Sequence, residues 1–292
     1  MRRPDRGVTL LFVLVILALA SGIVVTMVAI SETSVTRSQS YQQASAVQAL
    51  LAGGEATAII ALRRDLATSP EIDHDHEAWA LVNQADVAIE GGRFALALRD
   101  AQGRFNLTDL ATEGVLAQNR LRDIGAALKL DPVVAVKIIG LFTAPDAPTG
   151  LDQLGDRAGI SAANLTALAT MVTLLPGESA VNVNAAPVGL LAVLLNNPLQ
   201  ARLLDTRRAK LGYVTPADVA ALGIVLPAGL EFRSSYFRLQ VMAEAGTTRL
   251  LQDSLIQRRV DDNGNAVALV IARFQHPENQ LAAGFPLPPT SP

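Results

Sequence analysis

The fold is decided by the stretch RGVTLLFVLVILALASGIVVTMVAI, which spans residues 6–30. No charged side chain lies between Arg6 and Glu32. The hydrocarbon core of a bilayer is about 30 Å thick, and roughly 20 apolar helical residues cross it. In lipid such a segment must be helical, because only a helix pairs every backbone polar group within one segment. Residues 8–30 are therefore predicted to form a transmembrane helix.

The flank of this segment predicts its orientation. Arg2, Arg3 and Arg6 precede it, and Asp5 is the one acid among them. Short loops rich in arginine and lysine stay on the cytoplasmic side of a membrane. We therefore expect residues 1–7 in the cytoplasm and the long remainder of the chain on the other side.

A cleavable signal peptide is the competing interpretation of this segment. Such a peptide has a short apolar region followed by a small-residue cleavage site, and Ala18-Leu19-Ala20 provides a site of that kind. The apolar character, however, continues beyond this site to Ile30. The sequence thus favours a helix that is retained, and cleavage after Ala20 is the alternative to be tested.

The predicted helix continues beyond the membrane. No proline occurs from Glu32 to Leu66, and only Gly53 and Gly54 interrupt a run of good helix formers. Apolar residues recur here at helical spacing among polar ones, which is typical of an amphipathic helix. One helix over residues 8–66 would be on the order of 90 Å long. Its first half would be apolar all round and its second half amphipathic.

The composition narrows the classes of function. The chain has 292 residues and a net charge of −3, which argues against a general nucleic-acid-binding surface. It contains no cysteine, which excludes disulfides, thiolate metal ligands and a cysteine nucleophile. The sequence also lacks a Gly-x-Ser-x-Gly elbow, a phosphate-binding Gly-Lys-Ser/Thr loop and a His-Glu-x-x-His motif. We therefore predict a non-enzymatic protein.

The segment from Glu71 to Trp79 is rich in acids and contains His74 and His76, a combination that invites a metal hypothesis. The two histidines would share a face only in an extended segment, and no third histidine or cysteine lies nearby. Loops that bind hard cations also usually contain a glycine turn. A solvated acidic connection is the favoured interpretation, so neither a metal site nor a cofactor is predicted.

Strand-like alternation of apolar and polar residues occupies two separate blocks. The first predicts a hairpin, and the second predicts a three-stranded antiparallel meander. For both to belong to one sheet, the module between them must have its ends close together. The predicted strands are residues 85–89 and 92–100 in the first block, and 235–244, 247–258 and 266–274 in the second.

The chain between these blocks, from about Leu110 to Leu226, has the pattern of short helices. Asp131-Pro132 and Thr215-Pro216 are typical helix starts, with a capping side chain before a proline in the first turn. The C-terminal segment from Gln275 is rich in proline and is predicted to be disordered. The predicted helices span residues 115–128, 133–142, 161–175, 188–195 and 219–222.

The N-terminal pattern resembles that of type IV pilins and type II secretion pseudopilins, in which a short basic leader ends in glycine and a hydrophobic helix begins at once. The resemblance implies that a prepilin peptidase cuts between Gly7 and Val8 and that the new amine of Val8 is methylated. Most of the family has a glutamate at the fifth mature position, which is Phe12 here. That glutamate pairs with the amine of a neighbouring subunit, and the large minor pseudopilin K at the filament tip lacks it.

Four stretches, in the same order along the chain, resemble the K pseudopilins, the general secretion pathway protein K family. They are RGVTLL at residues 6–11, DAQGRFNL at 100–107, VNVNAAP at 181–187 and SSYFRL at 234–239. The resemblance implies an α+β fold with a pilin-like long N-terminal helix, an antiparallel sheet and a large all-α domain inserted in the sheet. The implied domains are a prepilin leader (1–7), a transmembrane and amphipathic helix (8–66), a first β region (67–107), the inserted helical domain (108–230), a second β region (231–274) and a disordered tail (275–292).

The resemblance also implies a function. A K pseudopilin is a non-enzymatic protein at the tip of the type II secretion pseudopilus, where it initiates assembly and supports protein export across the outer membrane. Its implied partners are minor pseudopilins I and J, with H as a further candidate, and the major pseudopilin, the prepilin peptidase and the inner membrane, but no nucleic acid. The implied location is a single pass through the inner membrane, with the N-terminus cytoplasmic and the bulk periplasmic, followed by the pseudopilus tip.

Some members of this family bind structural calcium near the second half of the inserted domain. The corresponding stretch here, residues 144–159, is short, and its only acids are Asp146, Asp152 and Asp156. No calcium site is predicted from them.

One alternative function rests on a different chemistry. Val181–Leu195 also resembles half of a helix-hairpin-helix of the kind found in membrane-anchored, competence-type DNA receptors. Such hairpins bind phosphate through glycine-rich loops, whereas the loop here is Leu195-Asn196-Asn197-Pro198. We favour the interpretation in which Asn182 and Asn184 brace a turn inside a packed helical domain. Weak DNA binding stays open because basic residues follow the loop at Arg202, Arg207, Arg208 and Lys210.

Overall fold

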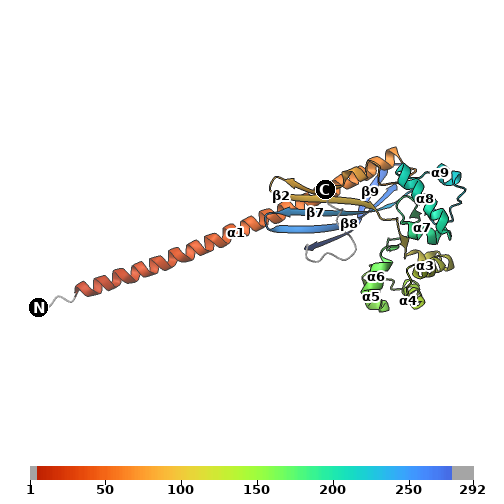
Figure 1. Cartoon of the computed structure of the whole chain (residues 1–292). Helices are drawn as coiled ribbons and strands as arrows, with labels where there is room; N and C mark the ends of the chain where they lie inside the picture. Colours follow the sequence, from red (N-terminus) through yellow and green to blue (C-terminus); the bar gives the residue numbers. More distant parts are fainter. Residues whose placement is uncertain (1–4, 278–292) are drawn as a thin grey trace.

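The computed structural model describes residues 5–277, and a single long helix dominates its shape (Figure 1). This helix, α1, runs from Asp5 to Thr68 without interruption over 64 residues. Its N-terminal half projects away from the rest of the molecule, and its C-terminal half lies along a β-sheet. The helix ends just before Pro70, because proline cannot continue a helix and restricts the residue before it.

Five antiparallel strands form the sheet in the order β1-β2-β7-β8-β9. Strand β2 pairs with β7 along its whole length, from Gly92 opposite Ala245 to Asp100 opposite Phe237. The chain therefore leaves the sheet after β2 and returns to the neighbouring position, as predicted for a module inserted in a sheet. The strands are β1 Gln84–Ile89, β2 Gly92–Asp100, β7 Tyr236–Ala245, β8 Thr248–Val260 and β9 Ala266–Pro277.

The C-terminal half of α1 packs on one face of this sheet. The helix comes close to the sheet at Gly54, where an added Cβ would meet Cγ1 of Val241 at 2.9 Å. An added Cβ on Gly53 would meet nothing within 4 Å, so only the second glycine faces the sheet. The core between them includes Val47, Leu51, Ala58 and Leu62 from α1, and Leu96, Leu98, Leu239 and Ile256 from the sheet.

A short connection joins α1 to the sheet and contributes Trp79 to the same core. Trp79 is 1% exposed, and its ring meets the ring of Phe237 edge-on at a centroid distance of 5.1 Å. A short 3-10 helix, Ala80–Val82, follows it and leads into β1. The acidic segment before Trp79 is thus held close to the end of α1.

The region between β2 and β7 is built mainly from short helices around a separate hydrophobic core. Phe105, Leu121, Ile138, Leu154 and Leu190 are among the buried residues of this core. The predicted caps are present: the Asp131 side chain accepts from the Val133 amide, and Thr215 and Asp218 form a capping box. The helices are α2 Asp109–Thr112, α3 Val115–Ala127, α4 Pro132–Phe142, α5 Gln153–Ala158, α6 Ala162–Leu168, α7 Val188–Leu194, α8 Pro198–Leu211 and α9 Pro216–Ala221.

The structure differs from the sequence-based expectation within this region. The helix expected over residues 161–175 ends at Leu168, because the chain beyond it forms a strand with the segment after β2. Tertiary pairing has here overridden a local helical pattern, so the region is not purely helical. Its short strands form two parallel pairs, β3 Phe105–Asn106 with β4 Val172–Thr173, and β5 Val181–Asn182 with β6 Leu230–Glu231.

Two further features differ from the sequence-based expectation. The pattern does not predict helices α2, α5 and α8, although Asn197 caps α8 and Pro198 stands in its first turn. Strand β9 extends to Pro277, so residues 275–277 form the end of a strand and are not a disordered tail. The rest of the predicted tail, residues 278–292, lies outside the described residues.

Candidate functional site: an exposed apolar helix and a buried polar junction

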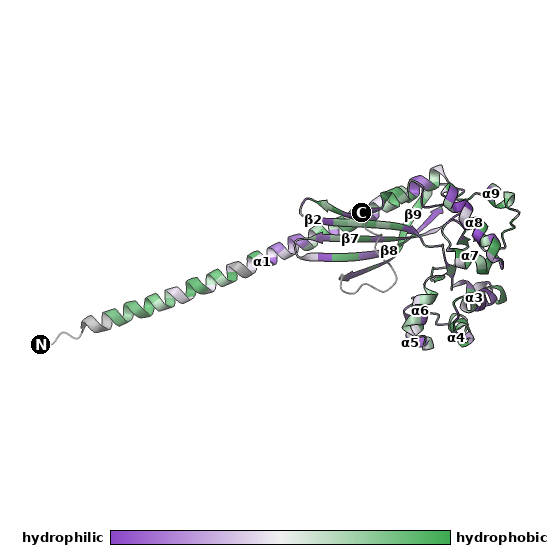
Figure 2. Cartoon of the chain, viewed as in Figure 1, coloured by the Kyte–Doolittle hydropathy of each residue, from purple (hydrophilic) through white to green (hydrophobic). Residues whose placement is uncertain are grey.

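The N-terminal half of α1 presents a continuous apolar surface. Every described side chain from Leu10 to Ile30 is exposed, and Figure 2 shows this half of the helix as predominantly hydrophobic. Among the described residues, α1 is the one helix that is long and apolar enough to cross a membrane. Exposing so much apolar surface to water is unfavourable, so this half of the helix requires lipid or another protein around it.

The sequence-predicted processing and register positions all lie on this part of α1. Gly7 and Val8 fall inside the helix, which begins at Asp5. Phe12 lies one turn further along and its side chain is 62% exposed. Cleavage before Val8 and the role of Phe12 stay predictions.

A second candidate site is a buried cluster of charged groups where α1 meets the sheet and the following loop. Arg258 on β8 is 2% exposed and donates to Asp65 Oδ2 at 2.7 Å and to a carboxylate oxygen of Asp73. Its guanidinium also donates to the carbonyl oxygen of Ser234 and lies over the Phe237 ring, 4.6 Å from the centroid. One arginine thus ties together the last turn of α1, the loop after it and the sheet.

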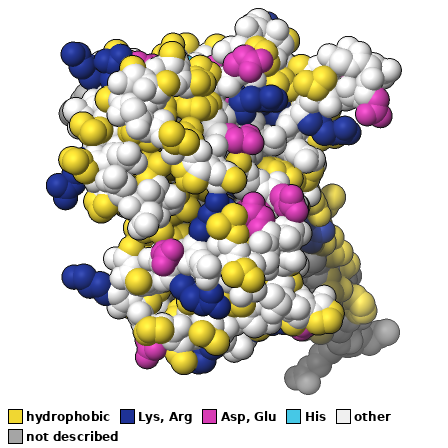
Figure 3. Space-filling view, turned by 90° about the vertical axis from the view of Figure 1, so that its right-hand side faces the viewer, with side chains coloured by type: hydrophobic (Ala, Val, Ile, Leu, Met, Phe, Trp, Pro, Cys, Tyr) yellow, Lys and Arg dark blue, Asp and Glu magenta, His cyan; other side chains and the backbone are white. Residues whose placement is uncertain are grey.

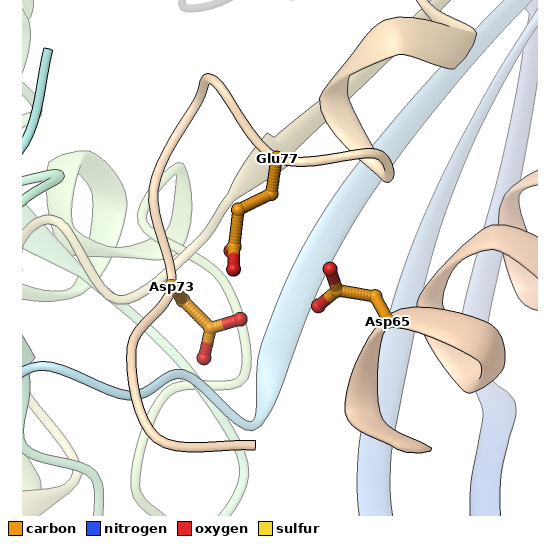
Figure 4. A group of neighbouring side chains, drawn as sticks. All are labelled: Asp65, Asp73 and Glu77. Atoms are coloured by element: carbon orange, nitrogen blue, oxygen red, sulfur yellow. The ribbon is translucent and has the colours of Figure 1, made fainter. Parts of the chain in front are cut away.

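Three carboxylates surround this arginine. Figure 4 shows Asp65 at the end of the helix and Asp73 and Glu77 in the following loop, with their carboxylates turned toward one another. Their oxygens lie within 4.8 Å of one another, a spacing that a metal ion could bridge. However, Glu77 already accepts hydrogen bonds from Ser69 Oγ, the His74 amide and Trp79 Nε1, each at 3.0 Å. Arg258 supplies the positive charge that the other two acids need.

The two histidines of this segment do not join the acids. His74 stacks on Tyr213 with the rings 3.8 Å apart, and His76 lies beside Asp75 at 2.9 Å between Nδ1 and Oδ1. The sequence-based metal hypothesis therefore gains no geometry from the histidines. Sequence reasoning did not find the contribution of Asp65, because it comes from the preceding helix.

The burial of this cluster changes its titration. Burial and the nearby charge of Glu77 raise the pKa of Asp65 to about 6, although the charge of Arg258 opposes this shift. Burial likewise raises the pKa of Asp73. One cation stands among three acids, so the charges are incompletely balanced and the folded protein holds protons more tightly here than the unfolded chain does.

The stretches that carry the family resemblance meet next to this cluster. Asn182 Nδ2 donates to Asp100 Oδ2, Ser234 Oγ and the Asp73 carbonyl oxygen, at 2.7, 3.0 and 3.0 Å. The side chain of Gln102 donates to Ala180 and accepts from the amides of Ser235 and Tyr236. Three stretches that are far apart in the sequence are therefore joined by buried hydrogen bonds, and we call this network with the acid–arginine cluster the polar junction.

Asparagines in the segment that resembles half of a helix-hairpin-helix form hydrogen bonds with the backbone of their own chain. Asn184 exchanges two hydrogen bonds with the backbone of Val214, at 2.8 and 3.1 Å. In the loop that would contact phosphate, Asn197 Oδ1 accepts from the amides of Leu199 and Gln200. Because those amides point to a side chain of their own chain, they do not present a ready anion site.

Comparison with known proteins gives a relative in sequence and matches among solved structures. No family profile matches the chain. Type II secretion system protein K of Pseudomonas aeruginosa is 24% identical over 255 residues, which are 75% of this chain and 77% of that protein. The crystal structure of the GspK–GspI–GspJ complex from the type 2 secretion system of enterotoxigenic Escherichia coli matches with a TM-score of 0.64 and 20% identity. This match covers 82% of this chain and 99% of the other and confirms the predicted pilin-like α+β fold.

Proposed function

Because the chain is related in sequence and in fold to type II secretion system protein K, we propose that it is a minor pseudopilin at the tip of a type II secretion pseudopilus. This relationship supports the prediction that the protein is not an enzyme. In the proposal, residues 8–30 hold it in the inner membrane, with the N-terminus in the cytoplasm and the body in the periplasm. At the tip it initiates assembly and supports export across the outer membrane.

The exposed apolar half of α1 is the observation that carries this proposal. A hydrophobic helix gains little by moving from lipid to protein unless the protein offers equally close apolar contacts. The N-terminal helices of other pseudopilins would provide such contacts in a filament. The C-terminal half of α1, which is bound to its own sheet, then fixes the folded body to that helix.

The lack of a charge at Phe12 supports a place at the end of the filament. Glutamate at the fifth mature position of most pseudopilins pairs with the amine of a neighbouring subunit, and a phenylalanine cannot make this pair. At the tip the pair is not needed to set the position of a further subunit. The tip position is therefore compatible with Phe12.

The partners follow from the same relationship. The solved relative is in a complex with GspI and GspJ, so we propose the corresponding minor pseudopilins as direct partners of this chain. Minor pseudopilin H, the major pseudopilin and the prepilin peptidase are further proposed partners.

Processing at Gly7 tests this function. We expect the mature chain to begin at methylated Val8, as read by mass spectrometry of its N-terminus. A Gly7→Val variant should keep its leader, stay in the membrane and fail to support secretion. Gly22→Ala is the matched control, because a Cβ there meets nothing within 4 Å, and it should be processed normally. A mature chain that begins after Ala20 would remove the filament role, as would normal secretion by Gly7→Val.

The DNA-receptor alternative receives little support from the described surface. Arg207 pairs with Asp218 at 2.6 Å, and Arg208 pairs with Asp205 at 2.7 Å. On the face shown in Figure 3, basic and acidic side chains are interspersed and form no single positive patch. Submicromolar binding of DNA by the full chain in detergent at physiological salt, measured by gel shift, would favour the alternative.

A further inference from the structure

Within residues 5–277 the five-stranded sheet has two edge strands, β1 and β9, and they differ in how strongly they oppose pairing with another chain. An edge strand presents a row of backbone donors and acceptors, and proteins block such edges with short strands, bulges and charged side chains. The β1 edge is blocked in this way. It spans only six residues, its register is irregular between Gln84 and Val87, and the Asp86 side chain accepts from Arg93 Nε at 2.8 Å.

The β9 edge lacks most of these features. The strand spans twelve residues, and Arg273 is the only one with a permanent charge. One extra residue, Ile271, forms a bulge against β8, and the register is regular on both sides of it. Pro277, which has no amide proton, stands only at the last position. Two regular stretches, residues 266–270 and 272–277, are therefore left for pairing.

The backbone of β9 directs hydrogen-bonding groups away from β8 at alternate residues. On β8, the amide of Arg258 donates to the carbonyl oxygen of Ser235, on the side of β7. In an antiparallel ladder the two residues of a pair bond either toward each other or both away from each other. Ala268 is the pair of Arg258, so its amide and carbonyl point to the open edge. An extended strand offers the complementary row of groups, whereas a helix does not.

Apolar side chains along this edge are exposed on the face of the sheet that is turned away from α1. Ala268 belongs to the core under α1, so the next residue, Leu269, points to the opposite face, where it is 49% exposed. Beyond the bulge, Arg273 faces α1 through its ion pair with Glu55, so Phe274 points to the opposite face and is 62% exposed. A strand added at this edge covers both side chains with apolar residues of its own.

Strand β9 also lies along the helix that the proposed filament uses. At one end, Arg63 Nε donates to the carbonyl oxygen of Ala266 at 3.2 Å. At the other end, the side chain of Gln275 donates to that of Gln48, also at 3.2 Å. The strand thus runs beside the C-terminal half of α1 and antiparallel to it. A neighbour whose helix packs along the exposed half of α1 brings its own body beside this sheet, and β9 is the edge that is open to it.

We propose that β9 is a docking edge for an extended strand of a neighbouring minor pseudopilin, which continues the sheet beyond β9. This inference rests on the proposed function, since it takes its partner from the same assembly. It adds the surface and the mode of contact, which are backbone hydrogen bonds at residues such as Ala268 and apolar contacts with Leu269 and Phe274. The strand that fits has alternating apolar and polar residues, because its apolar side chains must all lie on the face turned away from α1.

Site-specific photo-cross-linking tests the proposal, with the full chain in detergent mixed with minor pseudopilins I and J of the same secretion system. The chain has no cysteine, so Leu269→Cys labelled with benzophenone maleimide before mixing carries the probe at one position. Val87→Cys is the matched control on the other edge strand, where Val87 is 37% exposed. We expect an adduct with one of the two pseudopilins from Leu269→Cys and none above background from Val87→Cys.

Recovery of the partners with the tagged full chain gives a second readout. Leu269→Lys places a charge against an apolar strand, where the ammonium group loses hydration, and should lower the recovery of I and J roughly tenfold. Val87→Lys should leave the recovery unchanged. Thermal unfolding of both variants shows that the body is folded, as expected for exposed positions.

The outcomes separate this inference from the proposed function. If the wild type recovers I and J but Leu269→Cys gives no more adduct than Val87→Cys, the docking edge is overturned and the tip function stands. Equal recovery with the two lysine variants overturns it as well. If the wild type recovers neither partner, the proposed partners are wrong and docking at β9 falls with them. An adduct within the same chain, or between two copies of it, overturns the proposal by giving β9 a different occupant.

Discussion

The two halves of α1 belong to one unbroken helix, yet their surroundings are opposite. From Leu10 to Ile30 every side chain is exposed, and none carries a charge. Further along the same helix, Val47, Ala58 and Leu62 are fully buried against the sheet. The C-terminal half finds its apolar partner within its own chain, so its burial is part of folding. The N-terminal half must find a partner outside the chain, in lipid or in a neighbouring subunit, so its burial is part of assembly.

This difference predicts that substitutions in the two halves of α1 will have different effects on the stability of the folded body. Changes in the packed half should lower the free energy of unfolding of the body and affect assembly only through the loss of folded protein. Changes in the exposed half should leave the stability of the body almost unchanged. The following four predictions test this separation, and all are measured on the full chain in detergent micelles.

The largest effect is expected at Arg258, which fastens the end of the packed half to the sheet. Arg258→Ala leaves Asp65 and Asp73 buried without their cation, which should cost about 3–5 kcal/mol. The exposed neighbour Arg259 provides the control, and Arg259→Ala should change stability by less than about 0.5 kcal/mol. Urea unfolding compares the two variants. Equal losses would show that the junction does not hold the helix to the body.

A direct comparison of the two halves uses one leucine from each. Leu62 is 0% exposed and Leu17 is 57% exposed. Leu62→Ala should cost about 2–5 kcal/mol because it removes buried apolar atoms and leaves a cavity, whereas Leu17→Ala should cost less than about 0.5 kcal/mol. Unfolding of the body is followed by tryptophan fluorescence, since Trp79 lies in the core under α1. A large effect of Leu17→Ala on this signal would contradict the separation.

The adjacent glycines sharpen the comparison within the packed half itself. Gly54→Ala forces a methyl group against Val241, an overpacking cost of about 1–3 kcal/mol that the higher helix propensity of alanine offsets by about 1 kcal/mol. Gly53→Ala gains only the higher helix propensity of alanine, without an overpacking cost, and should raise the free energy of unfolding by up to about 1 kcal/mol. Opposite signs in thermal unfolding are the expected result. If both variants are stabilised, the helix does not approach the sheet as closely as the structure indicates.

The smallest effect concerns pH, because the packed half ends in a titrating acid, Asp65, whereas the exposed stretch Leu10–Ile30 contains none. Asp65 has a folded pKa of about 6, above its ordinary value of 3.8. The folded state therefore binds more protons between these values, and this contribution to stability is lost as pH rises from about 4 to about 6. Asp65→Asn should have the same free energy of unfolding as the wild type near pH 4. At pH 7.5 its free energy of unfolding should be higher than that of the wild type. If Asp65→Asn is instead less stable than the wild type at pH 7.5, the charge of Arg258 dominates the environment of Asp65.

Much of the fold could be predicted because it depends on patterns among residues that are close together in the sequence. The apolar run, the strand alternation on both sides of the helical region and the caps at Asp131 and Thr215 depend on neighbours a few positions away. The helix expected to reach Leu175 ends at Leu168 instead, because Val172 pairs with Phe105 and this pairing is not visible locally. Helix α8 was within reach of sequence reasoning, since Asn197-Pro198 is a typical helix start.

Some residues of the candidate sites could be identified from the sequence, whereas others are brought together only by the fold. Gly7, Val8 and Phe12 are identified by their positions relative to a leader and an apolar run, and their roles stay predictions. The acid–arginine cluster was only half visible, because Asp73 and Glu77 are close in sequence whereas Arg258 is 193 positions from Asp65. The four stretches that resemble the K pseudopilins could be identified from the sequence, but their structural role could not. The structure shows that the side chains of Gln102 and Asn182 form hydrogen bonds between the helical region and the sheet.

The sequence by itself determined where the chain is apolar enough to leave water and where it alternates or turns, because these preferences are set by each residue and its near neighbours. Only the tertiary structure decided which half of α1 is covered and which arginine pairs with the buried acids. The physical reason is that burial and charge pairing depend on distance in space. Distances between remote residues become defined only when β2 and β7 come together and close the sheet around the helical region.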